Sequence, residues 1–66
     1  MLIGYLTEYK GYEGTIEYDY EDDIHYGKLI NIEDFVNYNA KNVEDLYEQY
    51  KNAIDDYIEI KKELKQ

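Results

Sequence analysis

The sequence contains no cysteine, no proline, no serine and no long apolar run. Without cysteine, the chain has neither a disulfide framework nor a thiolate zinc site, the usual supports of a very small domain. The absence of serine excludes a serine nucleophile, and neither a P-loop nor a G-x-G-x-x-G motif is present. No segment reaches the eighteen apolar residues of a membrane span, and the Met-Leu-Ile start lacks the basic region of a signal peptide. These absences predict a cytoplasmic protein without a membrane segment.

The 66 residues allow one domain, 1–66, with a thin core, because a chain of this size buries only about 60% of its unfolded surface. Sixteen aspartates and glutamates against seven lysines give a formal charge of −9. This charge repels phosphates, so no direct nucleic-acid binding is expected. The 44% of hydrophobic residues, with ten tyrosines among them, favours a folded chain over a disordered one. Oligomerisation, as a homodimer or a higher homo-oligomer, is the remaining means of stabilising so small a fold.

The segment 11–20 alternates between apolar and polar residues, which is the two-residue period of a half-buried strand. One parity is therefore expected to face the core and the other to face solvent. The inward set is Tyr12, Ile16, Tyr18 and Tyr20, and the outward set is Glu13, Thr15, Glu17 and Asp19.

Two further strands are expected after the first. A polar break at 21–23 precedes strand-like residues at 24–30, which predicts a hairpin with three to five loop residues. A third strand at 34–39 would complete an antiparallel meander. The first nine residues either extend the first strand or cross the sheet edge before it, with bends at Gly4 and Gly11.

The C-terminal third predicts one long helix over about 43–63, with Asn42 as its N-cap. Lys61 falls on the centre of the apolar stripe, so the last two turns are expected to run past the sheet into solvent or to meet a partner. The fold class is therefore α+β: a three-stranded antiparallel meander followed by one helix, in the order β-β-β-α. The stripe comprises Val43, Leu46, Tyr47, Tyr50, Ala53, Ile54, Tyr57 and Ile58.

The carboxylates do not predict catalysis or a metal site. Glu13, Glu17 and Asp19 follow one strand at intervals of roughly 7 Å, whereas two-metal chemistry needs carboxylates that converge on ions about 4 Å apart. The acidic run 21–23 lacks the glycine and glutamate positions of a calcium loop. His25 is the only histidine and is expected to face solvent or to pack on a tyrosine, although nearby carboxylates leave a general base open. We predict a non-enzyme without metal or cofactor.

Protein binding is the better-supported class of function. Between Glu13 and Asp23 there are six carboxylates and no basic residue, so this segment attracts a basic partner or, alternatively, only keeps the domain soluble. Tyr9, Tyr20, Tyr26 and Tyr38 are interface candidates. Open sheet edges also favour a homodimer, edge to edge or helix to helix. The predicted partner-binding residues are Glu13, Glu17, Asp19, Tyr20, Glu21, Asp22, Asp23 and Tyr26.

Several spaced pieces resemble the N-terminal domain of HicB-family antitoxins: the Tyr-x-Gly at Tyr12, the acidic run, the Tyr-Gly at Tyr26, and Ala-x-Asp-Asp-Tyr ending at Tyr57. The resemblance spans about Tyr9 to Leu64. It implies a partial RNase H-like fold, β-β-β-α with a further short strand. It also implies that the chain binds and masks a HicA-type toxin, a small basic RNA-cleaving protein, by covering the toxin's RNA-binding face.

The sequence departs from the HicB pattern in two places. Asn39-Ala40-Lys41 stands where family members usually have glycine before the helix. After Gln66, family members usually continue into another strand and a DNA-binding domain. An alternative function is therefore open: a phage or mobile-element anti-defence protein on a HicB-like fold, which sequesters a basic host defence protein or a signalling molecule.

Overall fold

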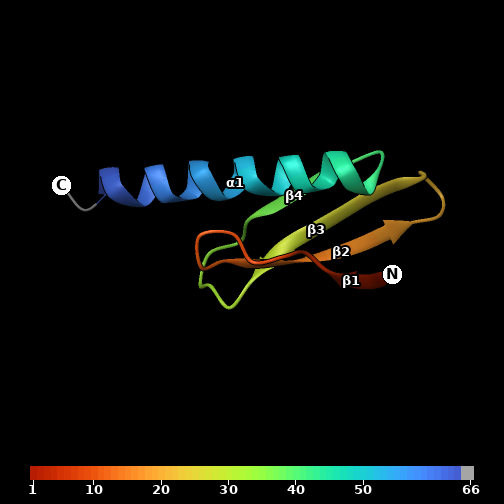
Figure 1. The fold of residues 1–66 in the computed structure, drawn as a ribbon, viewed down its shortest axis with the longest axis horizontal. Helices are drawn as coiled ribbons and strands as arrows, with labels where there is room; N and C mark the ends of the chain where they lie inside the picture. The colour runs from red at the N-terminus through yellow and green to blue at the C-terminus, as the bar shows by residue number, and fades with distance from the viewer. Residues whose placement is uncertain (65–66) are drawn as a thin grey trace.

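Four short strands and one long helix form the described part of the chain, residues 1–64, in the computed structural model (Figure 1). The strands form one antiparallel sheet in the order β1-β2-β3-β4, and the helix packs on one face of it. The α+β class and the meander followed by a helix are confirmed. The elements are β1 (Leu2–Tyr5), β2 (Glu13–Asp19), β3 (Ile24–Ile30), β4 (Asn37–Ala40) and α1 (Val43–Leu64).

The prediction of three strands is wrong, because the N-terminal residues form a fourth. Lys10 and Gly11 both have positive φ, 52° and 85°, as in the tight turns that join antiparallel strands. Tyr9 and Tyr12 exchange two backbone hydrogen bonds of 2.9 Å across this turn. The chain therefore doubles back, and β1 pairs with β2.

Two of the predicted boundaries also need correction. The predicted strand 11–20 is shorter, Glu13–Asp19, because its first residues belong to the turn. The third predicted strand, 34–39, begins later, at Asn37, and Phe35 lies in the loop before it. The strand 24–30 is confirmed, and the helix predicted over 43–63 is confirmed within one residue.

Alternation along β2 holds only in part. The register pairs Gly14 with Leu29, which is buried beneath α1, so the even-numbered residues of β2 face the helix. Thr15 was expected to face solvent but is only 6% exposed. Its hydroxyl accepts a hydrogen bond from the Lys28 amide (3.1 Å) and donates one to Glu17 (3.0 Å). Tyr20, which was expected to face the core, is 69% exposed because it follows the strand.

The core is organised around the ring of Tyr38, which lies over two glycines. A Cβ atom on Gly14 would collide with the Tyr38 hydroxyl and the Tyr50 ring, and one on Gly27 with the Tyr38 ring and the Thr15 carbonyl oxygen. The Tyr38 hydroxyl donates to that carbonyl (2.8 Å), and its ring meets Tyr50 edge-on at 5.4 Å. Burial raises the pKa of Tyr38 and raises that of Tyr50 to about 12, so both remain neutral.

Helix α1 starts at the predicted N-cap and buries most of the predicted stripe. The Asn42 side-chain oxygen accepts a hydrogen bond from the Asp45 amide (2.8 Å). Val43 was expected in the stripe but is 43% exposed. The last turns of α1 extend past the end of the sheet (Figure 1). Within the described residues, no helix combines the length and the apolarity that crossing a membrane requires. The buried residues of the helix are Leu46, Tyr50, Ile54 and Tyr57.

We expect Gly27→Ala to destabilise the fold by about 3 kcal/mol, because the new methyl group would overlap a backbone oxygen that no change of rotamer can move. Gly4→Ala is the matched control, since its Cβ atom would make an ordinary contact of 3.9 Å with Ile16. Urea denaturation followed by circular dichroism measures both free energies of unfolding. Equal stability of the two variants would contradict the role given to Gly27.

Candidate functional site

The acidic turn, residues 20–23, joins β2 to β3, and its loop of four residues agrees with the predicted length. Asp19 accepts a hydrogen bond from the Glu21 amide (2.9 Å), which holds the turn in shape. Asp23 has φ 51° and accepts a hydrogen bond from the Tyr18 hydroxyl, which raises the pKa of Tyr18. Glu21 and Asp22 are exposed. The turn therefore uses some carboxylates for its own structure and presents others to solvent.

The sheet face opposite α1, here called the uncovered face, carries no packed element in the described part of the chain. Glu17 and Tyr26 pair across β2 and β3 on this face. Phe35 is 76% exposed beside it. A hollow of about 320 Å³ opens here, lined by Glu17, Tyr26, Gly27, Lys28, Phe35 and Asn37.

The eight predicted partner-binding residues are spread along the uncovered face and the turn at its end. Glu13 and Asp19 stand at opposite ends of β2, about 20 Å apart at the usual rise of a strand. Glu17 and Tyr26 belong to the uncovered face, between these ends. Tyr20, Glu21, Asp22 and Asp23 form the acidic turn.

The tyrosines named as interface candidates have different positions. Tyr38 is only 5% exposed, so its prediction as an interface residue is wrong: the glycines opposite it leave room for its ring in the core. Tyr9 is half-buried and donates hydrogen bonds to Asp55. Tyr20 is largely exposed, and Tyr26 lies half-buried on the uncovered face. Tyr20 is therefore the most accessible of the four rings.

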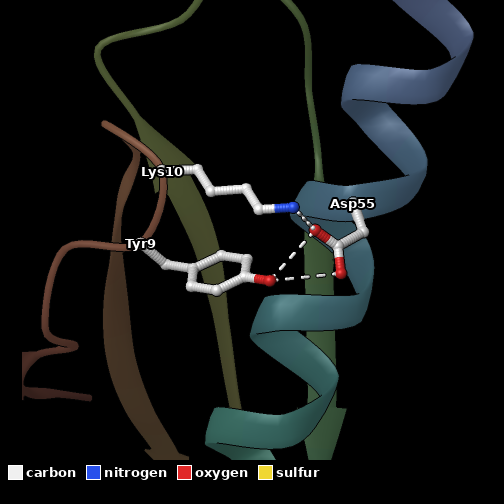
Figure 2. Close-up of polar contacts among 3 residues, drawn as sticks. All are labelled: Tyr9, Lys10 and Asp55. Carbon is white, nitrogen blue, oxygen red and sulfur yellow. Dashed lines mark hydrogen bonds and ion pairs between the residues drawn. The ribbon is translucent and has the colours of Figure 1, made fainter.

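A compact ionic cluster links the first turn to the helix, as Figure 2 shows. Asp55 of α1 accepts a hydrogen bond from the Lys10 ammonium (2.8 Å) and from the Tyr9 hydroxyl (3.1 Å). The Lys10 contact holds the pKa of Asp55 below its usual range. Sequence spacing did not reveal this cluster, because 45 residues separate Lys10 from Asp55. Tyr9 and Lys10 of the turn both donate to Asp55, so the cluster tethers the turn to α1.

His25 is the side chain for which the sequence left general-base chemistry open. Among the described residues, no group of three or more histidine, aspartate or glutamate side chains could hold a metal ion. The ring of His25 lies 4.9 Å from that of Tyr18, and its Nδ1 atom lies 3.1 Å from the Lys41 carbonyl oxygen. This placement agrees with the expectation that His25 packs on a tyrosine.

Comparisons of the chain with protein-family models, with curated proteins and with solved structures give no match. The resemblance to HicB-family antitoxins, carried by the pieces around Tyr12, Tyr26 and Tyr57, therefore stays a prediction from the sequence.

We expect Asp55→Asn to lower the stability of the fold near neutral pH, because the Lys10 ion pair and part of the Tyr9 bond depend on the carboxylate. The folded pKa of Asp55 is depressed, so its stabilisation is present above the unfolded value of about 3.9 and is lost as pH falls through the folded value. The difference between the wild type and Asp55→Asn should shrink over this acid range.

Asp56→Asn is the matched control, since this carboxylate is the exposed neighbour of Asp55 on the same helix. Urea midpoints across the acid range measure all three proteins. If the curves of the wild type and Asp55→Asn run parallel through this range, Asp55 does not tether the turn as a carboxylate.

Proposed function

We propose that this domain is a non-catalytic protein-binding module, a HicB-type antitoxin with a partial RNase H-like fold that masks a small basic HicA-type toxin. The observation that carries the proposal is the uncovered face, with the acidic turn at its end. A sheet with one face packed and one face open leaves a broad, ordered surface for another protein. The order of sheet and helix agrees with the fold that the resemblance implies.

Charge supports a basic partner. The chain has a formal charge of −9, and two of its lysines are already paired, Lys10 with Asp55 (2.8 Å) and Lys51 with Glu48 (3.1 Å). The carboxylates of the acidic turn have no cation in their sequence neighbourhood. A negative field of this kind raises the rate at which a cationic protein arrives and orients it on approach.

Contact chemistry supports the uncovered face as the place where such a partner docks. Phe35 is highly exposed, Tyr26 is beside it on the hollow, and both are of the ring type that anchors protein interfaces. Glu17 lines the same hollow and supplies a carboxylate for a basic side chain of the partner. The domain would inhibit by covering the toxin's RNA-binding face, without chemistry of its own.

The second candidate, an anti-defence protein of a phage or mobile element, rests on the same surface. A basic host defence protein would meet the same acidic turn and the same hollow. The two functions differ in what the captured protein does. A growth assay in cells therefore distinguishes them, whereas the shape of the binding surface does not.

We expect co-expression of this chain to restore the growth of cells that produce a small basic RNA-cleaving toxin encoded beside it. Phe35→Lys should abolish the rescue, because it removes the exposed ring and adds a second cation, beside Lys28, to the hollow that a basic partner must enter. Ile60→Lys is the matched control, since Ile60 is also strongly exposed (54%) but lies on the projecting end of α1. Colony counts under toxin induction measure the effect.

Failure of the folded wild-type chain to restore growth would reject the antitoxin function. Rescue of phage growth in a defended host, without rescue from the toxin, would establish the anti-defence alternative. Equal rescue by Phe35→Lys and the wild type would be consistent with the antitoxin function, but it would show that the toxin does not dock at the hollow.

Neutralising Glu13, Glu21 and Asp22 as Glu13→Gln, Glu21→Gln and Asp22→Asn should slow association with the basic partner about tenfold at low salt. These three side chains are exposed, whereas Asp19 and Asp23 hold the turn and are left intact. Stopped-flow kinetics over a range of ionic strength gives the association rate.

The control carries the same charge change elsewhere, as Glu33→Gln, Asp56→Asn and Glu59→Gln, which are also exposed residues. A steering effect specific to the acidic segment from Glu13 to Asp23 predicts a smaller change for this variant. Equal slowing in both would show that only the net charge matters, and no slowing in either would dismiss electrostatic steering.

A further inference from the structure

Strand β1 is an open edge with large apolar side chains. It stands at the end of the strand order, so the backbone groups on its outer side have no partner in the sheet. Leu2 and Ile3 are each 50% exposed, and Tyr5 is 61% exposed. The chain as a whole is polar, with a mean hydropathy of −0.84, so three exposed apolar side chains on one short strand stand out.

The β1 edge also lacks the side-chain charge that usually protects such an edge, and its charged group is the Met1 ammonium at its start, which donates a hydrogen bond to the Tyr18 carbonyl oxygen (3.0 Å). The first charged side chain in the sequence is Glu8, beyond the end of the strand. Natural edge strands are commonly blocked by lysine, proline or an irregularity of the backbone. A bulge between Leu2 and Gly4 is present, but it bears no charge and shortens the pairing surface without closing it. The opposite edge, β4, is Asn-Tyr-Asn-Ala and has α1 packed beside it.

We propose that two copies of this chain pair through their β1 edges in antiparallel fashion and form one continuous eight-stranded sheet. The charge distribution selects a second copy as the occupant. Two chains of charge −9 repel each other, and they can approach closely only where neither presents a carboxylate. The β1 edge meets this condition, and a twofold axis makes the contact self-complementary, with the start of one β1 strand against the end of the other.

The pairing has a definite consequence for the rest of the surface. A twofold axis that relates two adjacent antiparallel strands runs perpendicular to the sheet, so both α1 helices lie on one side of the assembly. The two uncovered faces join on the other side. The register pairs Leu2 with Glu17 and Tyr5 with Thr15, which places Leu2 and Tyr5 on this joined face. The dimer therefore carries two hollows on one surface, independently of what binds there.

We expect the wild type to sediment as a concentration-dependent dimer. Ile3→Lys should raise the dissociation constant of the dimer more than tenfold, because it places two ammonium groups against each other near the axis. Ile60→Lys is the matched control, with the same substitution at nearly the same exposure, 54% against 50%. It should dimerise like the wild type. Sedimentation equilibrium measures the constants, and circular dichroism verifies the fold of each variant.

A single introduced cysteine locates the contact independently of stability. The chain has no cysteine of its own, so Ile3→Cys and Ile60→Cys can form disulfides only between copies. Under mild oxidation, Ile3→Cys should form covalent dimers faster than Ile60→Cys. A monomeric wild type, a dimer that tolerates Ile3→Lys, or faster crosslinking through Ile60→Cys would each overturn the proposal.

Discussion

The hydrogen bond from the Tyr38 hydroxyl to the Thr15 carbonyl oxygen, 2.8 Å long, joins β4 to β2 across the strand between them. It requires the ring of Tyr38 to lie flat on the sheet, which only the bare backbone at Gly14 and Gly27 permits. Tyr50 of α1 then packs against this ring and over the backbone of Gly14. The position of the helix depends on this arrangement of the Tyr38 and Tyr50 rings over the sheet. The division of the sheet into a packed and an uncovered face follows from it.

Tyrosine is well suited to a core of this thickness because each ring ends in a hydroxyl that reaches a polar group at the margin. The Tyr50 hydroxyl donates to the carbonyl oxygens of Thr7 (3.0 Å) and Tyr12 (2.8 Å), and the Tyr57 hydroxyl donates to Asp34 (2.8 Å). Leucine would bury a similar apolar area but would leave these loop groups without their donors. The same side chains therefore fill the core and fix the loops that surround it.

Local patterns were enough to predict the helix, its Asn42 cap and the hairpin of β2 and β3, because caps and periodicities depend on neighbouring residues. Strand β1 was not predicted as a strand, since it depends on a Lys10-Gly11 turn and on pairing with residues ten or more positions away. Thr15 is buried with its hydroxyl bonded to the Lys28 amide, 13 residues away on the neighbouring strand, a contact that alternation does not reveal. The acidic residues were recognisable from the sequence. The hollow on the uncovered face was not, because the sequence had placed Phe35 inside the strand 34–39 and the structure places it in the loop before β4.

The two proposed contacts of this domain, the β1 edge and the uncovered face with its acidic turn, differ in charge, and each disfavours the partner of the other. A second copy is repelled from the acidic turn, because it carries the same carboxylates at the same place. A basic partner gains nothing at the β1 edge, because that edge offers no carboxylate for its cations. Specificity then comes from what each surface disfavours as much as from what it binds. One sheet of four short strands can in this way keep self-association at its edge and partner capture on its face, without competition between them.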